Sequence, residues 1–321
     1  MKGILEILRM SSYHEFNYRF MDKGRRHLWA VISIALTLLS IGSFLTKGMV
    51  LGIDFTGGTL LEIRYVQTAD LNQVRETLQS NGYKDAMVQY FGSSHDVLIR
   101  LGMREEKNSQ MISNEIMKLL NTDQNQVTMR RVEFVGPQVG KDLIEGGLWA
   151  MFYTTIGILV YVAVRFEKRF AAAAILAMLH DPILIIGIFS LFEFEFDLTV
   201  LAAILAIVGY SLNDTIVVFD RIRDNLIKMR KETTEEVMNI SINETLVRTI
   251  MTSFATLITV LALFFLGGDL IHGFALALII GIIIGTYSSI YIASAAALWL
   301  GIKRSDLMPI TPKENSLDNH P

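Results

Sequence analysis

The sequence contains no cysteine, only five prolines and only six histidines among its 321 residues. The missing cysteines exclude disulfides, thiolate metal sites and cysteine nucleophiles, and the few, scattered histidines argue against a metal centre. A basic excess is also lacking, because the formal net charge is −3, so nucleic acid is not expected as a partner. We therefore expect no metal, no cofactor and no catalytic residue, and we do not expect an enzyme.

Apolar residues, in contrast, make up 51% of the chain, and its mean hydropathy is +0.41. A bilayer core about 30 Å thick is crossed by a helix of about 20 mostly apolar residues. Six runs of at least about this length occur, at 27–46, 148–166, 170–192, 198–219, 249–266 and 273–300. The sequence thus predicts an α-helical membrane protein with six transmembrane helices and the lipid bilayer as its surroundings.

Lysine and arginine gather next to alternate ends of these runs, whereas the short connections 193–197 and 267–272 contain neither. Because basic loops stay in the cytoplasm, we predict a multi-pass protein with both termini cytoplasmic. The predicted parts are a cytoplasmic segment 1–26, helix 1 at 27–46, an outer domain at 47–147, helices 2–6 within 148–304 with an amphipathic cytoplasmic loop at 220–247, and a disordered cytoplasmic tail at 305–321.

The predicted outer domain alternates between the two periods of regular structure. Strands are expected at 59–65, 86–91, 95–101 and 127–135, and helices at 69–80 and 105–120. The resulting order, βαββαβ, is that of the ferredoxin-like α+β fold, in which the helices cover one face of the sheet. This fold hosts many functions, so it assigns none by itself.

Asp214 lies deep within the run 198–219, where a charged side chain costs about 2.5 to 3.5 kcal/mol. Helical spacing puts Tyr210, Ser211 and Asp214 on one face, which must look into the bundle. One interpretation is a carboxylate that takes up and releases a proton, with Asn213 adding to the polar surroundings. The alternative is a structural carboxylate held by fixed hydrogen bonds.

Arg248 opens the fifth run, and Thr252, Thr256 and Thr259 continue its face. The arginine is a candidate counter-charge for Asp214, since an opposite charge nearby favours an ionised carboxylate. Alternatively, Arg248 reaches toward the cytoplasm and the threonines bond their own helix backbone. The residues alone leave both interpretations open.

His180 and Asp181 precede Pro182 near the middle of the third run. A histidine beside a carboxylate can relay protons, whereas the alternative is a polar pair that stabilises a proline kink. Consecutive helical residues point about 100° apart, so we expect the two side chains to face different partners.

Two glycine-containing segments flank the outer domain and are predicted to form its turns or hinges. The first, 52–59 (GIDFTGGT), lacks the spacing and the lysine of a phosphate-binding loop. The second, 135–141 (VGPQVGK), leads back toward the membrane. The expected turn and hinge residues are Gly52, Gly57, Gly58, Gly136, Pro137 and Gly140.

These two segments resemble the SecF family of protein-export membrane proteins, as do His180-Asp181 and, above all, residues 211–221 (SLNDTIVVFDR). Arg248-Thr249 and Gly267-Gly268 extend the resemblance over nearly the whole chain. Pro182 departs from the family pattern, in which a valine is expected at this position.

The resemblance implies a subunit of the SecD-SecF accessory complex of the bacterial Sec translocase, in a fold related to the resistance-nodulation-division transporters. Its implied partners are SecD, the translocon channel with its associated subunits, and translocating preproteins, and its implied place is the bacterial inner membrane. Such complexes use the proton motive force to promote late export. The alternative function is a proton-coupled exporter of small molecules or lipids. By resemblance the proton-relay residues are Asp214, Arg248, His180 and Asp181, and their supporting polar face is Tyr210, Ser211, Asn213 and Thr252.

Overall fold

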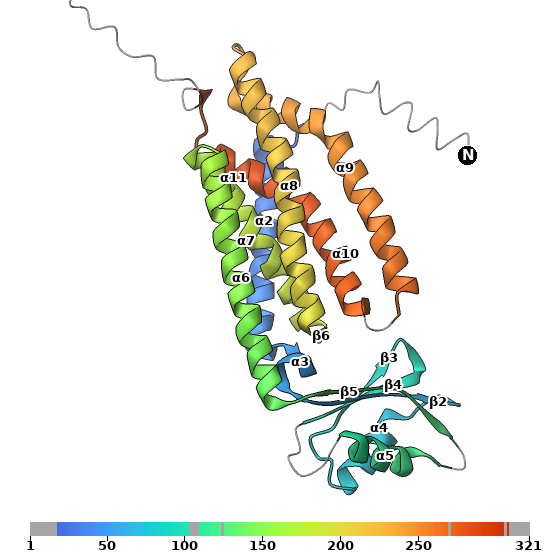
Figure 1. Ribbon diagram of the computed structural model, residues 1–321. Coiled ribbons are helices and arrows are strands. Elements are labelled where there is room, and N and C mark those ends of the chain that lie inside the picture. The colour runs from blue at the N-terminus through green and yellow to red at the C-terminus, as the bar shows by residue number, and fades with distance from the viewer. Residues whose placement is uncertain (1–17, 103–108, 123–124, 269–270, 305–306, 308–321) are drawn as a thin grey trace, which may run out of the picture.

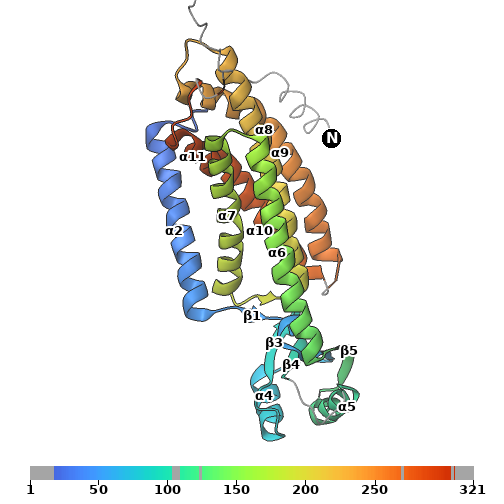
Figure 2. The same cartoon turned by 60° about the vertical axis from the view of Figure 1, so that its left-hand side comes forward.

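The computed structural model describes residues 18–102, 109–122, 125–268, 271–304 and 307. Long helices run side by side through most of the molecule, and a small sheet domain lies at one end of the bundle (Figure 1). The start of helix α2 and the end of helix α11 lie at the opposite end, away from the sheet (Figure 2). The predicted disordered tail, 305–321, falls outside the described residues apart from Leu307.

Six helices among the described residues are long and apolar enough to cross a membrane, which confirms the predicted class of fold. They are α2 (Lys23–Lys47), α6 (Pro137–Arg165), α7 (Lys168–Leu191), α8 (Leu198–Lys228), α9 (Thr234–Leu266), and a last helix made of α10 (His272–Tyr287), the π-helix η2 (Ser288–Ala293) and α11 (Ser294–Trp299).

Helices α8 and α9 continue well past the predicted spans. The segment 220–247, predicted to be a helix-prone amphipathic hairpin between the spans, consists mainly of these two extensions. Thr233 and Glu236 form a capping box that starts α9 beyond the apolar run. The Asn225 amide then joins the two extensions by donating a 3.0 Å hydrogen bond to Ser241.

Helix α6 likewise begins at Pro137, well before the predicted start at 148. Gly136 precedes the helix in an extended conformation, as expected of a turn residue. Gly140, however, lies inside the helix, so its prediction as a turn or hinge is wrong. A Cβ at Gly140 would lie 3.4 Å from the Gly57 nitrogen and from the Asp54 carbonyl oxygen. The glycine therefore allows close packing of α6 against the segment 52–59.

The sheet domain contains the predicted βαββαβ order of elements. Its strands are β2 (Gly58–Tyr65), β3 (Met87–Phe91), β4 (Ser93–Leu101) and β5 (Val127–Val135), and its helices are α4 (Leu71–Ser80) and α5 (Ser109–Leu120). All neighbouring strands are antiparallel, in the order β3-β4-β2-β5. Alternate strand residues such as Leu61 and Ile99 are fully buried against Leu78 and Ile116 of the two helices.

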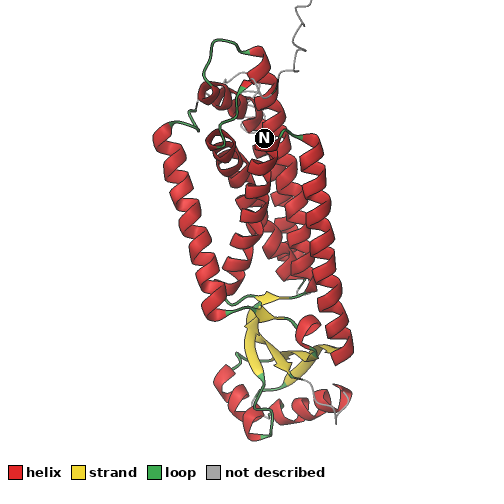
Figure 3. Ribbon diagram, turned by 90° about the vertical axis from the view of Figure 1, so that its left-hand side faces the viewer, coloured by secondary structure: helices red, strands yellow, loops and turns green. Residues whose placement is uncertain are grey.

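The sheet lies between the membrane helices and the pair α4 and α5 (Figure 3). Its face toward the bundle carries Leu60 and Leu98, which pack with Ile53 of the short helix α3 (Ile53–Thr56). Alternation along each strand thus produces two faces, one for the domain's own helices and one for the membrane bundle.

A two-stranded parallel sheet connects the two parts of the protein. Strand β1 (Val50–Leu51), just after α2, pairs with β6 (Glu195–Phe196), just before α8. Arg100 of β4 forms an ion pair with Glu195 at this junction. Burial raises the pKa of the Glu195 carboxyl, and the positive charge of Arg100 opposes that shift. A buried charge at the junction is thus stabilised by the sheet domain.

Candidate functional site

Helix α7 places His180 and Asp181 in the interior of the bundle, where both are buried. The Asp181 Oδ2 atom accepts hydrogen bonds from Ser211 Oγ of α8 (2.5 Å) and from Ser288 Oγ of η2 (2.9 Å). Its Oδ1 atom lies 3.0 Å from His180 Nδ1. The other ring nitrogen, Nε2, lies 2.5 Å from Ser33 Oγ of α2. This α7 network therefore joins four segments of the bundle, and His180 and Asp181 face different partners, as expected.

The arrangement of donors fits an ionised Asp181. Two hydroxyls donate to Oδ2, and the Nδ1–H tautomer of His180 donates to Oδ1. That tautomer leaves Nε2 free to accept the Ser33 proton. Every polar atom of the pair then has a partner, which is what makes a buried carboxylate tolerable.

Ser288 reaches Asp181 from a stretch of π-helix. One extra residue per turn changes the direction of the side chains, and such stretches are often found at functional sites. Just before it, a Cβ added at Gly285 would lie 3.0 Å from the Ser211 Cβ, so the backbones of α10 and α8 approach closely here. Close approach and the altered helix together bring Ser288 and Ser211 to the same carboxylate oxygen.

Asp214 is the second buried carboxylate, on the part of α8 that faces α9. Only 4% of the surface of Asp214 is exposed. The charged and polar groups that act on it, Arg248 and Ser253, both belong to α9. Its Oδ2 atom is buried and has no hydrogen-bond partner among the described residues. The same is true of the Thr249 hydroxyl on α9. An ionised carboxylate with an unpartnered oxygen is costly in this setting.

A short chain of hydroxyls leads from this carboxylate to α10. Ser253 Oγ lies 2.7 Å from Thr286 Oγ1, which itself donates to the Ile282 carbonyl at 2.7 Å. Either hydroxyl can be the donor in the bond between Ser253 and Thr286. Ser253 thus links Asp214 of α8 to Thr286 of α10.

Arg248 is exposed on the outer surface of α9, and it forms no ion pair within the part of the chain that the structure describes. Thr252 donates to the Arg248 and Thr249 carbonyls, both at 3.0 Å. Thr256 and Thr259 donate to carbonyls one turn back in the same way. The threonines of the predicted polar stripe therefore bond their own backbone, which was the alternative interpretation.

The remaining predicted site residues lie in different surroundings. Ser211 and Asp214 are both buried inside the bundle, as predicted, but Ser211 donates its hydrogen bond to Asp181. Tyr210 is partly buried and its hydroxyl has no partner among the described residues, whereas Asn213 is exposed. Sequence reasoning missed four participants, which are Ser33, Ser253, Thr286 and Ser288. The four-residue spacing of Thr249 and Ser253 was the one available signal for Ser253.

The fold and the two buried carboxylates define a helical membrane protein with ionisable groups inside its bundle. Residues 115–303 match the family model for the C-terminal part of the protein export membrane proteins SecD and SecF, and residues 42–69 match the model of the SecD/SecF GG motif. The chain belongs to the SecD/SecF family, as its motifs predicted, and within it to the SecF subunits of the protein translocase.

Its relatives support the assignment to SecF over most of the chain. The protein translocase subunit SecF of Pseudomonas aeruginosa is 46% identical over 298 residues, which cover 93% of this chain and 96% of the relative. The subunit of Vibrio alginolyticus is 50% identical over 280 residues, with 87% and 89% covered. These relatives carry the name of a translocase subunit, which favours the first predicted function over a small-molecule or lipid exporter.

Two solved structures of SecDF share the fold. The chain matches SecDF from Thermus thermophilus, described as a translocon-associated membrane protein, with a TM-score of 0.80 and 37% identity. It matches SecDF in a super-membrane-facing form with a TM-score of 0.62 and 34% identity. Each match covers 88% of this chain, but only 38% and 39% of the longer SecDF chains.

Proposed function

We propose that this chain acts as the SecF half of a SecD-SecF accessory complex that uses the proton motive force to promote late protein export across the bacterial inner membrane. The observation that carries the proposal is the Asp214 carboxyl, which is buried between α8 and α9 with its Oδ2 atom unpartnered. A group that gains and loses a proton needs such a site, because neither charge state is fully satisfied by fixed partners.

A proton arriving at Asp214 would change the balance of forces between α8 and α9. Neutralisation removes the attraction between the carboxylate and the Arg248 charge. The protonated group can then donate to the Ser253 hydroxyl, whereas the ionised group can only accept from it. Release of the proton restores the charged pair. Two arrangements of the same helices therefore alternate with the protonation of one side chain.

The transmembrane potential supplies enough free energy for this alternation. One elementary charge moving through 100 mV gains about 2.3 kcal/mol, which shifts a two-state equilibrium about 50-fold. In this proposal the His180–Asp181 pair acts as a second relay element, linked to α8 by the Ser211 hydroxyl.

SecD is the proposed partner, because the exposed side of α9 carries the charge of Arg248 among apolar residues such as Phe254. Only 17% of the apolar window of α9 is buried inside the chain, against 56% for α7. Arg248 lies on this exposed side, and an arginine inside a bilayer normally faces protein or water rather than lipid. Helices of SecD would cover it and complete the surroundings of Asp214. The translocon channel with its subunits and the translocating preprotein are the further proposed partners.

The proposed orientation puts the sheet domain, with its ferredoxin-like order of elements, in the periplasm. The support is the distribution of charge: α6 ends at Arg165 and α7 begins at Lys168, at the end of the bundle away from the sheet (Figure 1), whereas the connection at the sheet end, 193–197, contains no basic residue. Under the positive-inside rule segments 1–26 and 305–321 are cytoplasmic, helix 1 crosses at 27–46, and helices 2–6 cross within 148–304.

The test is export into inverted membrane vesicles that contain this chain co-purified with SecD. We expect Asp214→Asn to keep its association with SecD while losing the gradient-dependent part of export. Asp224→Asn, which changes an exposed carboxylate on the same helix, is the matched control and should export normally. Full gradient-dependent export by Asp214→Asn would disprove the proposal. Repeating the assay with a sodium gradient in place of a proton gradient identifies the coupling ion.

A further inference from the structure

Helix α8, which carries both Ser211 and Asp214, begins at the junction with the sheet domain. Its first backbone N–H, of Leu198, donates a 3.0 Å hydrogen bond to the Asp54 carboxylate, a residue 144 positions earlier in the chain. Asp197 caps the same turn by accepting from the Val200 N–H (2.8 Å) and the Thr199 hydroxyl (2.7 Å). The start of the helix therefore depends on one carboxylate of its own and on one from the segment 52–59.

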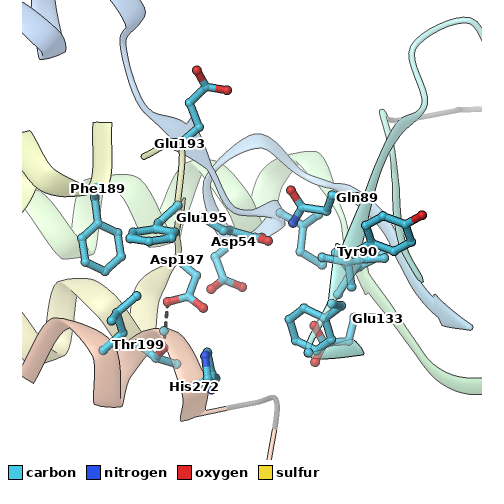
Figure 4. A pocket seen from close by; sticks show the side chains of 18 of the residues that line it. Asp54, Gln89, Tyr90, Glu133, Phe189, Glu193, Glu195, Asp197, Thr199 and His272 are labelled. Carbon is cyan, nitrogen blue, oxygen red and sulfur yellow. Dashed lines mark hydrogen bonds between the residues drawn. The ribbon is translucent and has the colours of Figure 1, made fainter. Parts of the chain in front are cut away.

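Figure 4 shows the carboxylates of Asp54 and Asp197 close to one another, beside Thr199 at the start of α8. They lie in a cavity of about 540 Å³ between the bundle and the sheet, with Glu133 and Tyr90 of the sheet domain on its other side. Next to the cavity, the two parts of the protein are joined by specific contacts.

The segment around Asp54 is held firmly to the sheet domain. Gly57 has a left-handed backbone conformation with φ of 67°, and Gly58 follows with φ of 127° as the first residue of β2. A Cβ added at Gly58 would lie 2.3 Å from the Leu101 carbonyl oxygen of β4. Any side chain at Gly58 would thus clash with the backbone of the neighbouring strand. Asp54, which accepts the hydrogen bond from the first N–H of α8, is therefore only four positions from Gly58, which is fixed against the sheet.

The same segment is held on two further sides. The Gly52 N–H donates to the Phe196 carbonyl at 2.8 Å and extends the pairing of β1 with β6. Arg100 of β4 donates to the Leu51 carbonyl at 2.5 Å and forms its ion pair with Glu195. A movement of the start of α8 must therefore either carry the sheet domain with it or break these contacts.

We propose that Asp54 is a positioning residue that couples the protonation-dependent movement of α8 to the sheet domain, through its hydrogen bond from the Leu198 N–H. The inference rests on the proposed function, in which Asp214 drives a rearrangement of α8. Asp54 touches neither the proton nor Asp214, and it acts through the end of the helix that carries Asp214. Arg100 supports the coupling by holding β1 and β6 to strand β4.

The test measures the position of the sheet domain directly in the SecD complex. Because the chain has no cysteine, spin labels can be attached to Gln79→Cys on α4 and Leu28→Cys on α2, both at exposed positions. The complex is reconstituted with SecD whose cysteines have been replaced. Asp214→Asn serves as a permanent mimic of the protonated state, and the distance distribution between the two labels is measured by electron paramagnetic resonance.

We expect Asp214→Asn to shift this distribution in the otherwise native chain, and Asp54→Ala to abolish the shift. Asp54→Asn keeps an oxygen acceptor for the Leu198 N–H and should restore it. The matched control is Asp70→Ala, which removes an N-cap carboxylate from α4 in the same domain, where it accepts from the Asn72 and Gln73 N–H groups. This control should leave the shift intact, because α4 does not touch α8.

An undiminished shift in Asp54→Ala would overturn the proposal, and so would the lack of any shift in the native background. If Asp54→Ala does not accumulate, Arg100→Gln tests the coupling without changing the α8 cap and should reduce the shift. Export is measured in the same samples. Gradient-dependent export that is lost in Asp214→Asn without any shift would leave the proposed function standing and remove only the coupling.

Discussion

The Ser211 hydroxyl of α8 donates a 2.5 Å hydrogen bond to the Asp181 carboxylate of α7, while Asp214, three positions later, faces Arg248 and Ser253 of α9. One helix thus separates a fully bonded carboxylate from one with an unpartnered oxygen. The difference assigns them different physical roles. Asp181 accepts hydrogen bonds that join four segments of the bundle, and Asp214 is the carboxylate for which we propose the driving change of protonation.

Removal of the Asp181 carboxylate should destabilise the bundle. Asp181→Ala leaves Ser211, Ser288 and His180 without their acceptor, and we expect a loss of about 3 kcal/mol. The measurement is unfolding of the purified chain in detergent. Asn213→Ala, an exposed change on α8, should alter stability by less than about 0.5 kcal/mol. Equal losses in the two variants would contradict the structural role of Asp181.

Gly187 allows α2 to approach α7, and even an alanine should be harmful there. A Cβ at this position would lie 2.1 Å from the Ser40 Cβ and 2.5 Å from its Cα. We expect Gly187→Ala to destabilise the chain by about 2 kcal/mol through overpacking. Gly157→Ala on α6 meets no atom within 4 Å and should be neutral or slightly stabilising, since alanine favours helices. A thermal unfolding series compares the two.

The Arg64–Asp96 ion pair should make the stability of the sheet domain depend on pH. The hydrogen bond from Arg64 is the main cause that lowers the pKa of Asp96 below its ordinary value. The ion pair therefore contributes its full stabilisation above about pH 4, the ordinary pKa range of a carboxyl group. The contribution is lost as the pH falls through the lower pKa that Asp96 has in the folded protein.

Arg64→Gln should accordingly weaken protection of the β2 and β4 amides at neutral pH and have little effect in acid. Because the Arg64 side chain is 45% exposed, the expected loss is only about 0.5 kcal/mol. Hydrogen exchange of the full chain measures it, after correction for the intrinsic exchange rate. A loss that is the same at neutral and acid pH would show that packing, and not charge, is responsible.

Tyr65 should limit the stability of the same domain in base. Burial raises the pKa of the Tyr65 phenol from 10.0 to about 12. A raised pKa in the folded state means that the contribution to stability is complete below pH 10 and is lost as the pH rises toward 12. Tyr65→Phe should therefore shift alkaline unfolding, followed by circular dichroism, to higher pH. An unchanged midpoint would contradict this account.

The sequence predicted the elements well, because each element has its own internal signal. The apolar runs are long enough to span a bilayer, and the strand at 59–65 alternates in a way that the structure confirms as two faces, Leu61 inward and Leu60 toward the bundle. Element ends were predicted less well. The starts of α6 and α9 depend on contacts such as the Thr233–Glu236 capping box and the packing of Gly140, which hydropathy does not register.

The hydrogen-bond partners within the site could not be predicted from the sequence either, for a related reason. Serine and threonine in membrane helices commonly bond their own backbone, as Thr252 does, and only packing distinguishes them from Ser253, which faces Asp214. The role of Asp54 was not predicted for a different reason. The glycines around Asp54 were enough to predict a turn there. They gave no indication that the Asp54 carboxylate accepts a hydrogen bond from Leu198, 144 residues away.

The π-helix at Ser288–Ala293 changes how the last membrane helix should be compared with its relatives. The small residues from Gly273 to Ala297 recur every four positions in the sequence, as if one continuous face ran through the helix. The π-turn shifts the phase of that repeat: Gly281, before it, lies close to Ile207 of α8, and Ala297, after it, packs in the core cluster with Phe170 and Phe219. Deleting one residue within η2 would remove the residue that the wider π-turn accommodates and so change which side chains of this turn face α7 and α8. The length of this segment, more than its composition, is what a variant must preserve.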